Sequence, residues 1–195
     1  MRFLSLLCAL LVGVSVSFAH ATELKTFGDQ NAPATIYLFS SFTCPHCAHY
    51  HKDVLPLVKE RFVDTGMAKL VFVDMAYDAS AMGGALLSRC VPNDQYEPLL
   101  KVLYENQGAW AYGGKVKEKL TGYAKLLGMS ETDVNRCFAD KELQRKIIEQ
   151  RNNLSQLYNV RGMPTTVLIK QGKSYSFVGA DPDVVLSELD EALGQ

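Results

Sequence analysis

The sequence has almost no excess of charge of either sign. It contains 20 lysine and arginine residues against 21 aspartate and glutamate residues, and its formal net charge is −1. A chain without a positive balance lacks the electrostatic basis for binding nucleic acid or an anionic membrane surface. We therefore expect neither as a partner.

Internal repeats and low-complexity segments are also absent from the sequence. Their absence excludes a repeat architecture. The 195 residues suit one domain that carries a large insertion.

The N-terminal residues have the layout of a secretory signal peptide. Arg2 supplies a positive charge, residues 3–18 form a nearly uncharged apolar run, and small residues occupy the −3 and −1 positions before a cleavage site after Ala21. The alternative is an uncleaved anchor, although the run is short for a membrane-spanning helix. We expect residues 1–21 to be removed and the remaining chain to be exported.

Hydrophobic patterns predict the first half of the fold. Apolar runs at residues 34–40 and 68–75 predict two buried strands. Between them a helix is predicted to begin near Cys44, with a kink at Pro56 and an end at Gly66. This order is a βαβ unit.

The second half combines a helical block with a ββα unit. Helical patterns without strand signals occupy residues 79–89, 95–106, 115–127, 130–139 and 140–158, with Ser130 and Asp140 as predicted N-caps. Strands at 165–170 and 173–179 predict a hairpin, and a helix follows Asp181 and Pro182.

This order predicts an α/β fold in which helices cover one mixed sheet. We expect residues 22–78 to form its first half, residues 79–150 an all-helical insertion, and residues 151–195 its second half.

The segment "SSFTCPHCAHYH", residues 40–51, carries the most chemistry. Cys44 and Cys47 lie where a strand meets a helix, and the free N–H groups and positive dipole of a helix start stabilise a thiolate. His46 adds a donor or a positive charge between them. A stabilised thiolate favours the reduced form, which makes the disulfide oxidising.

A metal site is the main alternative for this segment. Structural zinc sites take a second, distant ligand pair, which the sequence lacks. His49 and His51 lie two positions apart on a helix and therefore diverge, and haem attachment needs a histidine where Ala48 stands. We favour a redox pair over a metal site or a purely structural bridge, and expect no metal.

Two motifs carry a family resemblance. "FTCPHC" after a strand, with "RGMPTT" (residues 161–166) before a late strand, resembles the thioredoxin superfamily. The Cys-Pro-His-Cys form with a helical insertion resembles DsbA-type periplasmic thiol-disulfide oxidoreductases, and residues 44–66 are similar to the alphaproteobacterial branch. The resemblance covers essentially the whole chain after residue 21 and implies a thioredoxin-like fold.

The resemblance also implies roles for the first motif. Cys44 is the expected nucleophile and Cys47 the resolving thiol, while Pro45 and His46 tune their potential. Leu38 replaces the acidic residue that well-known members bury under the site, so the proton path is expected to differ or to use water.

The second motif is implied to bind substrate. Pro164 matches the family's cis-proline, and Met163 and Thr165 flank it on the segment that pairs with an extended peptide. Met163 departs from the Val or Thr that is frequent before this proline.

The implied activity is that of an oxidase in the periplasm, which donates its Cys44–Cys47 disulfide to reduced secreted proteins. A membrane oxidant of the DsbB type, linked to quinone, would regenerate it, and no bound cofactor is needed. A disulfide isomerase, a reductase and, more remotely, a copper-binding chaperone are the alternatives. Residues 22–33 are too few for the dimerisation segment of isomerases, so we expect a monomer.

The other chemical side chains have simpler expected roles. Cys90 and Cys137 are predicted to form a structural disulfide, with exchange with the redox pair as the alternative. His49 and His51 are expected to be solvated rather than to assist proton transfer, and Trp110 to pack in the insertion rather than to line a substrate surface.

Overall fold

The computed structural model describes residues 23–194. The expected signal peptide, residues 1–21, lies outside the described residues. Within residues 23–194, no helix has both the length and the apolar character needed to cross a membrane.

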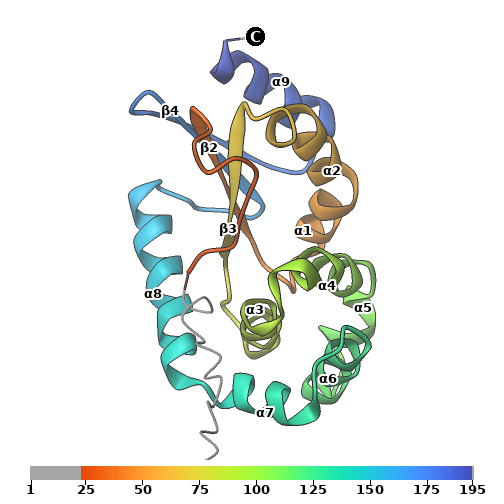
Figure 1. Cartoon of the computed structure of the whole chain (residues 1–195). Helices are drawn as coiled ribbons and strands as arrows, with labels where there is room; N and C mark the ends of the chain where they lie inside the picture. The colour runs from red at the N-terminus through yellow and green to blue at the C-terminus, as the bar shows by residue number, and fades with distance from the viewer. Residues whose placement is uncertain (1–22, 195) are drawn as a thin grey trace, which may run out of the picture.

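A five-stranded mixed sheet forms the centre of the fold, in the order β1-β3-β2-β4-β5 (Figure 1). The central strand β2 (Ala34–Ser40) pairs in parallel with β3 (Ala68–Asp74) and antiparallel with β4 (Thr165–Lys170). The edges are β1 (Thr26–Phe27), antiparallel to β3, and β5 (Lys173–Val178), antiparallel to β4. The predicted mixed α/β fold is confirmed, and β1 is an addition to it.

The predicted hairpin between β4 and β5 is present. Gln171 and Gly172 connect the strands with φ angles of 50° and 76°. Two consecutive left-handed residues match the twist of the flanking strands, and glycine supplies the second without steric cost.

The helix after β2 is continuous but changes its winding. It consists of α1 (Pro45–His49), η2 (Tyr50–Val54), α2 (Leu55–Val58) and η3 (Lys59–Val63), where the η segments are π-helical. The first wide turn directly precedes Pro56, where a kink was predicted. Proline has no N–H to donate and its ring collides with the carbonyl four residues earlier, and a π turn relieves that collision.

The helical insertion lies below the sheet in Figure 1. Its helices are α3 (Ala79–Cys90), α4 (Asn93–Glu105), α5 (Gln107–Trp110), α6 (Val116–Leu126), α7 (Glu131–Ala139) and the start of α8 (Lys141–Leu157). Ser130 and Asp140 act as N-caps, as predicted. The expected boundary between residues 150 and 151 falls inside α8, which returns along the sheet.

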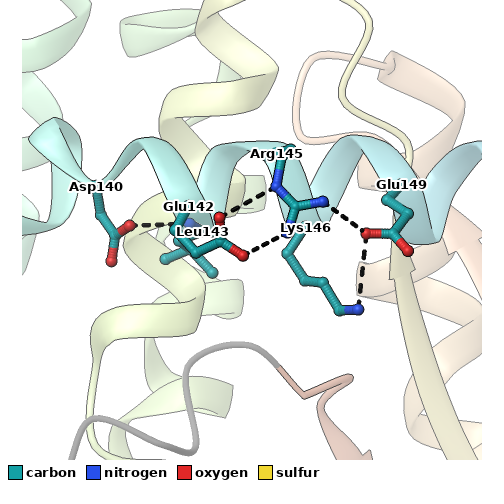
Figure 2. Close-up of polar contacts among 6 residues, drawn as sticks. All are labelled: Asp140, Glu142, Leu143, Arg145, Lys146 and Glu149. Atoms are coloured by element: carbon teal, nitrogen blue, oxygen red, sulfur yellow. Dashed lines mark hydrogen bonds and ion pairs between the residues drawn. The ribbon is translucent and has the colours of Figure 1, made fainter.

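Helix α8 owes part of its stability to local polar contacts (Figure 2). The Asp140 side chain accepts the N–H of Leu143, and Arg145 contacts both Glu142 and Glu149. These exposed pairs at spacings of three and four are individually weak and screened by salt. They support a helix that has few buried residues of its own.

Helices cover both faces of the sheet (Figure 1). The helix after β2 and the last helix, α9 (Pro182–Leu193), lie on one face, which continues into the core of the insertion. On the other face, Leu154 and Tyr158 at the end of α8 pack on a smaller cluster that includes Phe39 and Val167.

A buried tryptophan and a disulfide stabilise the helical insertion. Trp110 is fully buried, as expected, and donates its indole N–H to the carbonyl of Leu103 at 2.8 Å. A disulfide joins Cys90 at the end of α3 to Cys137 in α7, 47 positions apart. Closing a loop of this size stabilises the fold by about 4 kcal/mol in the chain-entropy model.

Gly84 allows α3 to approach the segment that leads into the Cys-Pro-His-Cys motif. A Cβ atom at Gly84 would lie 2.8 Å from Cγ of Phe42, closer than real contacts permit. We therefore predict that Gly84→Ala lowers the free energy of unfolding by about 1–3 kcal/mol, measured by urea denaturation. Gly122→Ala is the matched control, because it adds the same methyl group to α6 with no atom within 4 Å. It should raise stability by about 0.5–1 kcal/mol, and equal stabilisation by both substitutions would contradict the steric role of Gly84.

Candidate active site

The two cysteines of the motif differ in exposure. Cys44 is the N-cap residue of α1 and is half-buried, whereas Cys47, in the first turn, has 0% of its surface exposed. Both are free thiols in this structure. Only Cys44 is therefore accessible to a large reactant.

Burial dominates the chemistry of the inner thiol. It raises the pKa of Cys47 to about 12, although the Ser41 N–H, at 3.4 Å from the sulfur, and the Ser40 hydroxyl act in the opposite direction. The neighbouring Cys44 adds to the increase. At neutral pH the inner sulfur consequently carries a proton.

The predicted substrate segment lies beside the outer thiol. The Cys44 Sγ is 3.8 Å from the carbonyl oxygen of Met163, a residue 119 positions away in the sequence. The Met163–Pro164 peptide bond is cis. Thr165 is fully buried and donates its hydroxyl to the carbonyl of Gly162 at 2.8 Å.

The two residues between the cysteines point outward. Pro45 and His46 are both exposed, at the N1 and N2 positions of α1. Proline suits N1 because its φ angle is already helical and no N–H is required there. The structure thus brings Cys44, Cys47, Met163 and Pro164 together, with His46 at the rim.

The insertion contributes a polar brace that was not predicted. The buried Gln107 in α5 donates from one side-chain nitrogen to the carbonyls of Phe42 and Cys44, at 2.9 and 3.0 Å. The hydroxyl of the exposed Tyr112 lies 2.7 Å from the carbonyl of Thr43. The loop before α1 is thereby held from the insertion side, and only the segment "QGAWAYGG" around Trp110 hinted at a role for this region.

A second brace comes from the start of α3. Asp78 caps this helix by accepting the N–H of Ala81, and its other carboxylate oxygen accepts the Thr43 hydroxyl at 2.7 Å.

The expectation of a solvated side chain is wrong for His51. Its ring is half-buried and stacks on Tyr104 with centroids 3.8 Å apart, while Phe72 lies on its other side. Its Nε2 is 3.1 Å from the hydroxyl of Ser40, which is also 2.9 Å from the hydroxyl of Tyr104. Burial lowers the pKa of His51 to about 3, so the ring is neutral at physiological pH.

His49 is exposed, as expected, and pairs with Asp53 at 2.7 Å. In the part of the chain that the structure describes, no three His, Cys, Asp or Glu side chains are grouped to hold a metal ion.

Comparisons with known proteins agree with this geometry. A family model described as Thioredoxin matches residues 21–177, and the chain belongs to this family. The crystal structure of α-DsbA1 from Wolbachia pipientis has a TM-score of 0.78 and 24% identity, over 88% of this chain and 91% of that one. BdbD from Bacillus subtilis, in its oxidised form, gives 0.73 and 25%, over 88% and 94%. The resemblance to DsbA-type proteins is therefore confirmed.

Curated relatives are similar at the same level. A putative protein-disulfide oxidoreductase of Rickettsia conorii is 25% identical over 183 residues, 92% of this chain and 64% of the relative. Disulfide bond formation protein D of Bacillus subtilis is 25% identical over 146 residues, 71% of this chain and 64% of that protein. The chain spans 57% of the length of a further rickettsial relative, from Rickettsia typhi, at 24% identity over 79% of this chain.

The buried histidine makes stability depend on pH. An unfolded His51 binds a proton with an ordinary pKa near 6.5, whereas the folded one does so only near 3. The unfolded state therefore binds more protons across this window, and stability falls as the pH falls through it. The free energy of unfolding of the wild type should therefore decrease between pH 7 and pH 5. We predict that this decrease is about 2 kcal/mol smaller in His51→Phe, measured by urea denaturation at both pH values. An unchanged dependence in His51→Phe would contradict a neutral, buried His51.

Proposed function

We propose that the chain is an exported protein dithiol:disulfide oxidoreductase that works as an oxidase. The observation that supports this best is the asymmetry of the Cys44–Cys47 pair beside Met163. One sulfur is accessible to a polypeptide and the other is shielded from it. Such a pair can exchange disulfides with a protein substrate through the outer sulfur alone.

The reaction proceeds in two exchanges. A substrate thiolate attacks Sγ of Cys44, the Cys44–Cys47 bond breaks, and its electron pair leaves on Sγ of Cys47, which takes up a proton. The mixed disulfide then joins the substrate to Cys44. A second substrate thiolate attacks the substrate sulfur of that bond, and Cys44 leaves as a thiolate with both cysteines reduced.

The substrate binds as an extended segment next to Met163. The carbonyl of Met163, just before β4, faces the Cys44 sulfur. The exposed Tyr112 lies at Thr43, and the exposed Val178 lies beside Gly162, so both offer apolar surface near the site. Backbone pairing gives affinity with little dependence on sequence. Reduced, incompletely folded secreted proteins present such segments.

The setting follows from the same proposal. The protein works in the periplasm as a monomer and without a bound cofactor, and Pro45 and His46 tune its potential. A membrane oxidant of the DsbB type, linked to quinone, accepts its electrons. The Cys90–Cys137 disulfide has a structural role, because it closes the insertion at the far ends of α3 and α7.

Variants of the two cysteines test the direction of attack. Cys44→Ser should abolish oxidation of a reduced dithiol peptide, because the accessible sulfur is gone. Cys47→Ser mixed with oxidised glutathione should instead accumulate the Cys44–glutathione mixed disulfide, detected by mass spectrometry without reductant, because Cys47 is no longer present to displace the glutathione. Peptide oxidation by Cys44→Ser at the wild-type rate would refute the assignment of the nucleophile.

An equilibrium with glutathione separates an oxidase from a reductase or isomerase. We expect the oxidised fraction of Cys44–Cys47, measured by alkylation and mass spectrometry, to fall to one half at a potential near the oxidising end of the family, around −120 mV rather than the −270 mV of thioredoxin. Those two values are general reference points for DsbA and thioredoxin. His46→Ala should shift the midpoint toward the reducing end with the fold intact. A wild-type midpoint near that of thioredoxin would refute the oxidase.

A further inference from the structure

The buried sulfur poses a chemical problem in both directions of the reaction, and this inference rests on the proposed function. When the Cys44–Cys47 bond breaks, Cys47 leaves as a thiolate in an apolar interior and must gain a proton. When the bond re-forms, the Cys47 thiol must lose that proton before its sulfur can attack Cys44. Bulk solvent does not reach the sulfur, because none of the surface of Cys47 is exposed.

The end of β2 lies against the shielded sulfur, because the N–H of Ser41 donates to Sγ of Cys47 at 3.4 Å. The hydroxyl of the preceding residue, Ser40, favours the Cys47 thiolate and so acts to lower its pKa. The same hydroxyl lies 3.1 Å from Nε2 of His51. The Ser40 hydroxyl therefore lies between the end of β2 that contacts Cys47 and the imidazole of His51.

Tyr104 orients this chain. Its hydroxyl is 2.9 Å from Ser40 Oγ. Burial raises the pKa of Tyr104 well above its usual value, so the phenol keeps its proton. Either hydroxyl can donate in this contact, and the relay uses the arrangement in which Tyr104 donates to Ser40. A serine hydroxyl has one proton of its own, which is then free to point to His51 or to Cys47.

The other nitrogen of His51, Nδ1, is buried and has no hydrogen-bond partner among residues 23–194. The imidazole also lines a cavity of about 630 Å³ between the helix after β2 and α4, with Leu55, Pro56 and Leu100 among its walls. A buried nitrogen without a partner is costly, and the adjoining cavity is where a proton acceptor would meet it.

We propose that Ser40 and His51 form a proton relay that serves Cys47. During closure of the disulfide, the Cys47 proton passes to Ser40 Oγ as the Ser40 proton passes to Nε2 of His51, and the proton on Nδ1 passes to a water molecule that enters from the adjoining cavity. Sγ of Cys47 attacks Sγ of Cys44, and the partner sulfur of the mixed disulfide leaves with the electron pair. The same path in reverse protonates Cys47 when it is the leaving group.

The relay leaves His51 without a resting charge, since one nitrogen gains a proton as the other loses one. This agrees with a ring whose protonated form is disfavoured by burial. The titratable groups that face the histidine and its cavity are Lys52, Lys59, Glu97, Lys101, Tyr104 and Glu105. In this relay Ser40 acts on the reacting sulfur itself, whereas His51 acts through Ser40 and is a positioning residue.

Closure of the disulfide can be timed directly. The reduced protein is mixed with a large excess of oxidised glutathione, quenched with acid at intervals, and analysed by mass spectrometry, which separates the Cys44–glutathione adduct from the closed disulfide. Ser40→Ala and His51→Phe should slow closure about ten-fold to a hundred-fold at pH 7, within the range of general acid–base catalysis. The deficit should shrink toward pH 9, where hydroxide can take the proton. Formation of the adduct, which needs only Cys44, should keep its rate.

Two controls separate proton transfer from packing. Ser40→Thr keeps the hydroxyl, so its Cys44–Cys47 disulfide should close much faster than that of Ser40→Ala. If His51→Phe does not fold, the comparison of these two variants tests the relay. His49→Phe places the same side chain two positions away on an exposed site and should close at the wild-type rate.

The outcomes distinguish the two proposals. If the wild type closes and Ser40→Ala and His51→Phe close equally fast, or lose the same factor at pH 7 and pH 9, the relay is refuted and the proposed function stands. If the wild type forms the adduct but does not close, the proposed function is refuted and the relay with it.

Discussion

The placement of the site depends on the two-sided pairing of β2. This strand is hydrogen-bonded to β3 along one edge and to β4 along the other, with Phe39 opposite Thr165. Because β2 and β4 are antiparallel, the end of β2 lies beside the start of β4. The turn after β2 therefore delivers Cys44 to Met163 across 119 positions of sequence. A slip of one residue in this register would turn Leu38 from the core to the opposite face and move both ends of the site.

The insertion does more than lengthen the chain, because it holds the loop that carries the cysteines. Gln107 and Tyr112 contact the carbonyls of this loop from one side, and Asp78 holds Thr43 from another. In the last turn of α3, the buried Arg89 pairs with Asp74 at the end of β3. A buried ion pair adds little net stability but is costly to break, so it holds the C-terminal end of α3 against the sheet. The geometry of Cys44 is thus set by the insertion as well as by the sheet.

The sequence predicted what repeats at a regular interval and missed what depends on contacts between distant segments. Strand β2 and the caps Ser130 and Asp140 were located because alternation, apolar runs and capping residues are local signals. Strand β1 has two residues, too few to show a period, and the role of Gln107 arises only once α5 lies against the loop. The error at His51 is of another kind. The side chain was expected to be solvated because histidine is polar, and its position on the face of the helix was not considered.

The helical period itself could have placed His51. It precedes the buried Leu55 by four positions and the buried Val58 by seven, which is the spacing of one helical face. A polar residue on an apolar stripe needs a partner in the interior, and Ser40 at the end of a buried strand is near enough to provide one. The inference requires the sheet and helix to be docked, which periodicity alone does not supply.

Burial of Cys47 has two opposing consequences for its chemistry. The polar side chains of Ser40, His51 and Tyr104 bear on both. Because Cys47 is shielded, thiols of protein substrates exchange only with Cys44. Mixed disulfides therefore form on the sulfur where a second thiol can resolve them. The same shielding raises the pKa of Cys47 to about 12, so little of this thiol is ionised at pH 7 and attack by its sulfur is disfavoured. An inner thiol protected in this way can react quickly only if its proton has an internal route. The unpartnered Nδ1 of His51 is costly in an apolar interior, and that cost is explained if His51 and Ser40 supply the route.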